Sequence, residues 1–83
     1  MYSIVLADKF KKQLKKIPKQ EQERIGKVIE RIKIRPFSHA ERIVGSPHFR
    51  VRSGDYRIII NIKQKVLIIY VLEVGHRKNI YKK

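Results

Sequence analysis

The segment from residue 48 to residue 57 constrains the fold more than any other part of the chain. Apolar and basic residues alternate before Gly54, as expected for a strand, whose side chains point alternately to two faces. A Gly-Asp pair between two such runs predicts a two-residue hairpin turn, because glycine readily adopts a positive φ. This turn would set Arg52 opposite Arg57. We therefore expect Arg50, Arg52 and Arg57 to share one face of a hairpin.

Three arginines on one face of a sheet need an explanation, because like charges opposite each other destabilise a strand pair. An anionic ligand would explain the cluster, since one guanidinium group can bind two phosphate oxygens through two parallel hydrogen bonds. The charge of the whole chain also favours an anionic ligand. Its net charge is +14, from 21 Lys and Arg against 7 Asp and Glu. Such a charge favours polyanionic partners, with nucleic acid first, an anionic membrane surface second and an acidic protein third.

The remaining pattern predicts an α+β fold within a single domain, residues 1–83. Tyr2–Leu6 is rich in β-branched residues and predicts a strand. Asp8 is expected to cap a helix, and two helices with apolar stripes of period 3.6 meet at Pro18. The expected order is β-α-α-β-β-β, with a helical hairpin packed on one face of a mainly antiparallel sheet. The expected segments after the first strand are helices in 8–17 and 19–34, a loop over 37–47, and strands in 48–53, 56–62 and 66–74.

A second tight turn at Gln64-Lys65 is expected to pair Ile60 with Ile69. The face opposite the helices then carries the arginines and an apolar patch. A solvent-exposed face rarely carries several large apolar side chains together, so this patch predicts a partner site. The patch consists of Ile59, Tyr70 and Leu72.

The last strand should deliver His76 and Arg77 to the end of the sheet that holds Arg52 and Arg57, with Tyr81 nearby. Such a set can bind RNA. It can also cleave RNA without a metal, if a base deprotonates the ribose 2′-hydroxyl while arginines stabilise the developing charge. Lysines around the first helix and near the end of the chain are either a solvated face or a second surface for phosphates. The lysines assigned to RNA binding are Lys9, Lys12, Lys16 and Lys78.

Several other functions are disfavoured by the composition. The chain contains no cysteine, which excludes disulfides and thiolate zinc sites and favours a reducing, cytoplasmic environment. The three histidines lack the spacing of metal ligands, and no cofactor motif is visible, so neither a metal nor a cofactor is expected. No apolar run approaches the roughly 20 residues that a membrane-spanning helix needs. We see no signal peptide.

These motifs resemble the RelE branch of the RelE/ParE toxin superfamily. The resemblance rests on Phe-Arg-Val-Arg at 49–52, Gly-Asp-Tyr-Arg at 54–57 and Val-Gly-His-Arg at 74–77, followed by Tyr81. It extends over essentially the whole chain. It implies a toxin of a type II toxin–antitoxin system, a ribosome-dependent endoribonuclease that cuts mRNA in the A site. It also implies a cognate, RelB-like antitoxin that we expect to be acidic and to cover the apolar patch in a hetero-oligomer.

The resemblance assigns roles to individual residues. Arg50 and Arg52 would contact the scissile phosphate, Arg57 would stabilise the transition state, and Arg77 would contact a phosphate or the leaving group. Tyr81 would stack on the substrate base.

The chain departs from the family at the general base. In the family, a lysine at one of the positions 50 and 52 is the proposed general base, whereas this chain has arginine at both. Arginine does not give up its proton in proteins. His76 is then the first candidate for the base and Tyr81 the second, or electrostatics and ribosome-imposed geometry carry most of the rate. Two alternatives remain for the whole protein. One is a ParE-like toxin that inhibits DNA gyrase by binding, and the other is an RNA-binding protein without catalytic activity.

Overall fold

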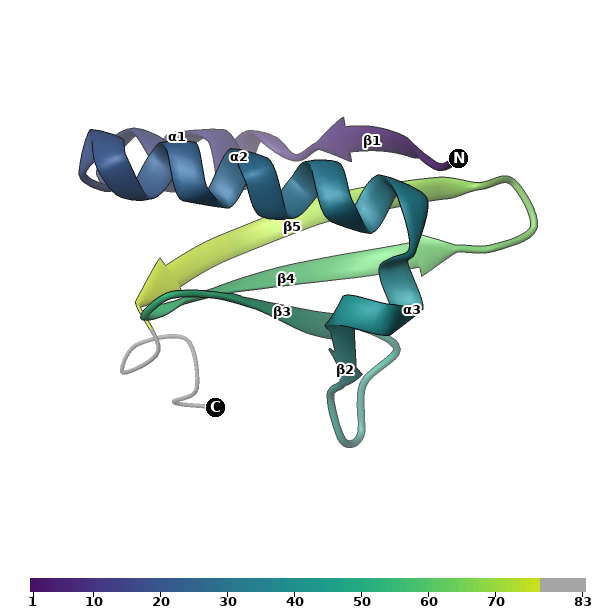
Figure 1. The fold of residues 1–83 in the computed structure, drawn as a ribbon. Helices are drawn as coiled ribbons and strands as arrows, with labels where there is room; N and C mark the ends of the chain where they lie inside the picture. Colours follow the sequence, from purple (N-terminus) through teal and green to yellow (C-terminus); the bar gives the residue numbers. More distant parts are fainter. Residues whose placement is uncertain (77–83) are drawn as a thin grey trace.

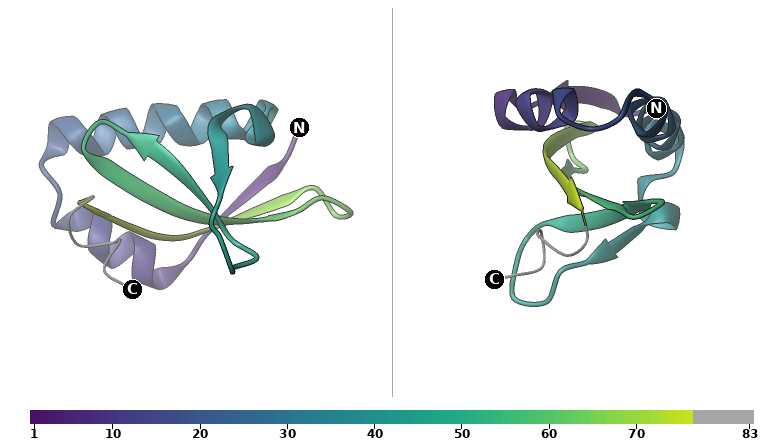
Figure 2. Two further views of the ribbon diagram at one scale, coloured as in Figure 1. Left: turned by 90° about the horizontal axis from the view of Figure 1, so that it is seen from below. Right: turned by 90° about the vertical axis from the view of Figure 1, so that its left-hand side faces the viewer.

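The computed structural model describes residues 1–76, and the sheet at its centre has five strands in the order β1-β5-β4-β3-β2. Two long helices lie on the same side of this sheet (Figures 1 and 2). The elements in chain order are β1 (Ser3–Leu6), α1 (Asp8–Lys15), α2 (Lys19–Ile34), α3 (Pro36–His39), β2 (Ala40–Arg42), β3 (Phe49–Ser53), β4 (Tyr56–Lys63) and β5 (Ile68–His76).

The sheet is mixed, because β1 pairs with β5 in parallel while the other three pairs are antiparallel. This arrangement confirms the predicted α+β class and the mainly antiparallel sheet. The predicted loop over 37–47 is wrong in part, since this segment forms the short helix α3 and the edge strand β2. Pro36 starts α3 at a position where a missing N–H is tolerated.

The hairpin predicted around Gly54 is confirmed in turn and register. Gly54 has a φ of +61°, and Asp55 is not among the residues with positive φ. A positive φ at the first central residue alone is the pattern of a type II′ turn, which suits the twist of an antiparallel pair. Arg52 pairs with Arg57, and Arg50 pairs with Ile59.

The second hairpin differs from its predicted register. The strands are joined by residues 64–67 rather than by a two-residue turn, and Leu67 adopts a φ of +55°. Ile60 therefore pairs with Val71 instead of Ile69. This turn lacks the Gly or Asn that would have marked its tight position in the sequence.

A β-bulge further changes the pairing of β4 and β5. Ile60 pairs with Val71 while Ile59 pairs with Glu73, so Leu72 is the extra residue on β5. The extra residue reverses the alternation of β5, and Val74 becomes a core residue together with Val71.

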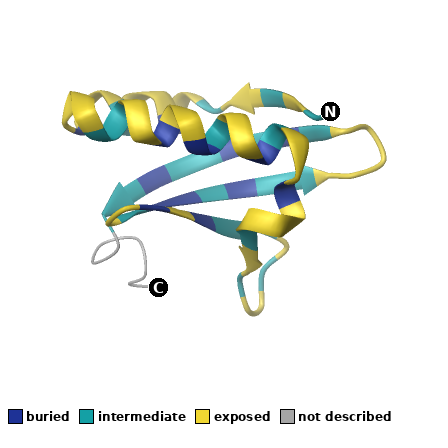
Figure 3. Ribbon diagram, viewed as in Figure 1, coloured by how far each residue is buried: buried dark blue, intermediate teal, exposed yellow. Residues whose placement is uncertain are grey.

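The core lies between the helices and one face of the sheet (Figure 3). The periodic apolar positions of both helices supply one side of it, as predicted, and the alternate residues of three strands supply the other. The buried apolar residues are Phe10, Ile17, Ile25, Val28, Ile32, Val51, Ile58, Ile60, Ile69, Val71 and Val74.

Helix α1 begins at Asp8, which is thus a first-turn residue and not the cap that we predicted. Ala7 occupies the N-cap position, and no side chain caps this end. The carboxylate of Asp8 still lies next to the positive end of the helix dipole. None of the helices within residues 1–76 is long and apolar enough to cross a membrane.

Candidate functional site on the arginine face

The register of β3 and β4 places Arg50, Arg52 and Arg57 on the sheet face that points away from the helices. We call this the arginine face. Arg52 is exposed and Arg50 is half-buried, whereas Arg57 is only 8% exposed. The cross-strand partner of Arg57 on β5 is Gly75, which has no side chain. The three guanidinium groups therefore meet solvent to very different extents.

Glu41 is a residue of this face that the sequence did not reveal. It lies on β2 opposite Arg50, and its Oε1 accepts a hydrogen bond of 3.1 Å from Arg50 Nε. This bond, followed by the positive charge of Arg52, lowers the pKa of Glu41 below its ordinary value of 4.5. Because β2 has only three residues and sits in a predicted loop, nothing in the sequence placed this carboxylate beside the arginines.

An open cavity of about 270 Å³ adjoins the two groups of this ion pair. It lies where β2 begins and the edge of β3 is no longer paired, since β2 pairs only with Phe49–Val51. Basic side chains dominate its polar lining, and Glu41 is the carboxylate among them. The lining residues are Val28, Arg31, Ser38, His39, Ala40, Glu41, Arg50, Val51 and Arg52.

His76 reaches the predicted end of the sheet but lies on its other face. It pairs with Tyr56, and the two rings form an edge-to-face contact with centroids 5.6 Å apart. Cross-strand partners share a face, and the neighbouring pair of Ile58 and Val74 is buried under the helices. The register thus sets His76 at the rim of the helical side and not among the arginines.

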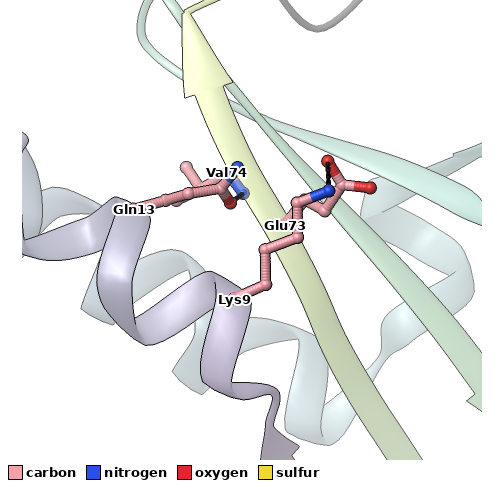
Figure 4. A network of polar contacts seen from close by, with 4 residues as sticks. All are labelled: Lys9, Gln13, Glu73 and Val74. Carbon is pink, nitrogen blue, oxygen red and sulfur yellow. Dashed lines mark hydrogen bonds and ion pairs between the residues drawn. The ribbon is translucent and has the colours of Figure 1, made fainter.

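Lys9 and Gln13 connect α1 to the free edge of β5 (Figure 4). β1 pairs with β5 only as far as Val71. Beyond that point, Gln13 Oε1 accepts a 2.8 Å hydrogen bond from the backbone N–H of Val74, and Lys9 Nζ lies 3.3 Å from Glu73 Oε1.

Two further lysines extend this side of the helix. Lys12 and Lys16 follow Lys9 by three and seven residues, which puts them on the same side of α1. Both are exposed. A stripe of lysines therefore runs along the β5 edge of the molecule.

The predicted apolar patch is half-buried on the arginine face. Ile59, Tyr70 and Leu72 all have intermediate exposure, although Leu72 occupies the bulge. Arg77, Lys78 and Tyr81 lie outside the described residues. Within residues 1–76, no group of three or more His, Asp or Glu side chains is arranged to hold a metal ion.

Comparison with known proteins gives a consistent result. The profile of a family described as the ParE toxin of the type II toxin–antitoxin system parDE matches residues 4–81. No curated protein sequence matches the chain.

Several solved structures with the same fold come from toxin–antitoxin complexes. The RelB–RelE complex of Methanococcus jannaschii contains a chain that is 30% identical, with a TM-score of 0.74 and coverage of 94% of this chain and 95% of that one. The RelBE2 complex of Mycobacterium tuberculosis contains a chain that is 20% identical, with a TM-score of 0.82 and coverage of 92% and 98%. The corresponding values for the archaeal RelE–RelB complex of Pyrococcus horikoshii are 22%, 0.79, 94% and 97%.

Proposed function

The chain belongs to the ParE toxin family of type II toxin–antitoxin systems, and from this premise we propose that it is an endoribonuclease that cuts translated mRNA in the ribosomal A site. The toxin class follows from the family. The reaction is our inference, and the observation that carries it is the arginine face, where Arg52 and Arg57 are cross-strand partners. Two adjacent guanidinium groups stabilise the additional negative charge of a phosphate under attack.

In the proposed reaction the 2′-hydroxyl of the nucleotide before the cut attacks its own 3′-phosphate. Arg50 and Arg52 hold the non-bridging oxygens of the phosphate. Arg57, with only 8% exposure, acts from a site where water screens its charge less. Lys9, Lys12 and Lys16 on α1 attract the RNA or ribosomal backbone from the neighbouring edge. Arg77 and Tyr81 keep the roles that the resemblance implies for them, and Lys78 keeps its assignment to RNA binding, as part of this proposal.

We further propose that an acidic, RelB-like antitoxin covers the apolar patch of Ile59, Tyr70 and Leu72 in a cytoplasmic hetero-oligomer. The support is twofold. These side chains are half-buried beside a strongly basic surface, and the RelE relatives named above were solved with RelB-type partners.

The experiment is cleavage of mRNA on purified ribosomes, with cut sites mapped by primer extension. We expect the chain to give discrete cuts in the A-site codon. Arg57→Ala should slow cleavage by about 10²-fold, the usual effect of losing one preorganised group that stabilises the transition state. Arg35→Ala removes an exposed arginine at the C-terminal end of α2 and should leave the rate unchanged. Equal rates for all three proteins would contradict the proposal.

A second candidate is inhibition of DNA gyrase by binding, because the family profile that matches is that of a ParE toxin. This function requires no catalytic group. A supercoiling assay with purified gyrase separates the two. Loss of supercoiling, without any mRNA cuts on ribosomes, would favour the second candidate.

A further inference from the structure

We propose that Glu41 is the general base of the RNA cleavage reaction, which is a role left open when position 50 or 52 carries an arginine. This inference rests on the proposed ribonuclease function. It starts from the cross-strand pair of Glu41 and Arg50, which sets a carboxylate within hydrogen-bond distance of a guanidinium on the arginine face.

The geometry suits the reaction. In RNA cleavage the attacking 2′-oxygen lies beside the phosphorus of its own 3′-phosphate, at about 3–3.5 Å in a reactive conformation. A base must therefore lie next to the group that binds this phosphate. Glu41 Oε1 lies 3.1 Å from Arg50 Nε. A phosphate bound by Arg52, which lines the same cavity as Glu41, brings the 2′-hydroxyl of the same nucleotide toward the carboxylate.

The cavity beside this pair gives the ribose a place to lie. Its volume of about 270 Å³ lies just below the range of about 300–1,000 Å³ that is usual for ligand sites. Glu41, Arg50 and Arg52 line it together, and Arg31 from α2 and His39 from α3 are among its other lining residues. The side chain of Glu41 is itself 57% exposed, so RNA can reach it without any rearrangement of the fold.

The electrostatics of the site keep the carboxylate in the form that accepts a proton. The hydrogen bond from Arg50, and then the charge of Arg52, lower the pKa of Glu41, while the charge of Arg57 acts in the same direction. Glu41 is thus ionised at neutral pH. When the substrate phosphate binds, it shares the hydrogen-bond donors of Arg50 and adds a negative charge nearby. Both effects raise the pKa of Glu41 and so make it a stronger base in the complex.

The proposed step balances without any additional reactant. The carboxylate of Glu41 takes the proton of the 2′-hydroxyl, the 2′-oxygen forms a bond to phosphorus, and the bond from phosphorus to the 5′-oxygen breaks. Solvent water protonates the departing 5′-oxygen. The products are a 2′,3′-cyclic phosphate and a 5′-hydroxyl, and Glu41 returns its proton to solvent.

The decisive variant is Glu41→Gln, because its carbonyl oxygen can still accept a hydrogen bond from Arg50 but cannot take up a proton. We expect the single-turnover rate on programmed ribosomes to fall by about 10²-fold or more, the range for a positioned proton acceptor. Ribosome binding should be unchanged or tighter, because a negative charge has been removed from an anion site. Glu41→Asp, which keeps a carboxylate, should recover part of the rate.

The matched control is Glu30→Gln, which removes the same charge from an exposed side chain of α2 that pairs with Lys33. It should cleave at the rate of the unmodified chain. A second measurement does not depend on the Glu41→Gln variant. Formate can stand in for the missing carboxylate, so formate added to Glu41→Ala should raise the cleavage rate in a concentration-dependent way.

The possible failures are distinguishable. If the unmodified chain makes no cuts, the proposed function is wrong. If the unmodified chain cleaves and Glu41→Gln cleaves equally fast or faster, Glu41 is only an internal ion-pair partner of Arg50, and the inference is overturned. Loss of cleavage together with weaker ribosome binding, and no recovery by aspartate or formate, would also overturn it.

Discussion

Arginine at positions 50 and 52 changes what the arginine face can do. Its planar group binds a phosphate through two parallel hydrogen bonds and remains charged at every accessible pH. It therefore binds and stabilises, but it cannot take a proton from the substrate. A separate acceptor is then required, and Glu41 is the carboxylate that contacts Arg50 within the described part of the chain.

The first residue-scale prediction concerns the titration of Glu41. Arg50 lowers the pKa of this carboxyl in the folded state, so its ionised form stabilises the fold above about pH 4.5. That contribution is lost as the pH falls through the lowered folded-state value. We expect carbon NMR to show Glu41 titrating below 4.5, and Arg50→Ala to return the midpoint toward that value. Arg42→Ala, which alters a neighbour on β2, serves as the control. An unchanged midpoint in Arg50→Ala would contradict the assigned cause.

Gln13 carries the second prediction at this scale. Its Oε1 accepts the N–H of Val74, a residue only 2% exposed, at the point where β5 loses β1 as its neighbour. Gln13→Ala leaves this donor without its partner, which costs about 1–3 kcal/mol of unfolding free energy. Urea denaturation measures the loss. Gln20→Ala, an exposed position in α2, should change stability much less. Equal stability of the two variants would show that water replaces the bond.

At the scale of elements, the two hairpins show what a sequence can specify. Gly54 marks its turn because a two-residue hairpin loop needs a positive φ there, which glycine readily adopts, and the predicted register is correct. Residues 64–67 contain no such marker, and the register slips by two. The Leu72 bulge has no local signal either, because it depends on how β5 packs against β4 and the helices. Apolar periodicity in α1 and α2 predicted the side of each helix that faces the core, although Leu14 and Ile29 on these stripes are only half-buried.

Gly26 in α2 gives a prediction at this scale. A Cβ added there would meet no atom within 4 Å, so close packing does not require glycine. Gly26→Ala should stabilise the protein by about 1 kcal/mol, the difference in helix propensity. Gly54→Ala is the matched variant for which we expect the opposite effect on stability. There the φ is +61° and a Cβ would lie 2.9 Å from Arg24 Nη1, so the melting temperature should fall. Changes of the same sign in both variants would exclude this explanation.

At the scale of the whole molecule, the sequence predicted the layer of helices, the mainly antiparallel sheet and the gathering of arginines on its open face. It did not predict the carboxylate of Glu41, because that contact depends on a three-residue edge strand. It also did not predict the side of the sheet that holds His76, because the bulge at Leu72 reverses the alternation of β5 before that residue. Both errors concern long-range pairing, which short segments do not encode by themselves.

The net charge of +14 leads to the last prediction. The radius of gyration is 11.8 Å, and the screening length is about 10 Å at 0.1 M salt, so most pairs of charges are screened as salt rises. Mutual repulsion opposes the compact state. Sodium chloride between about 0.05 and 0.5 M should therefore raise the melting temperature, and the rise should shrink when Lys63 and Lys65 are both changed to Gln. Both lysines are exposed, Lys63 at the end of β4 and Lys65 in the loop that follows it, and neither takes part in the ion pairs of Glu41 and Glu73. A melting temperature that falls with salt would mean that specific pairs such as Arg50 with Glu41 outweigh the net repulsion.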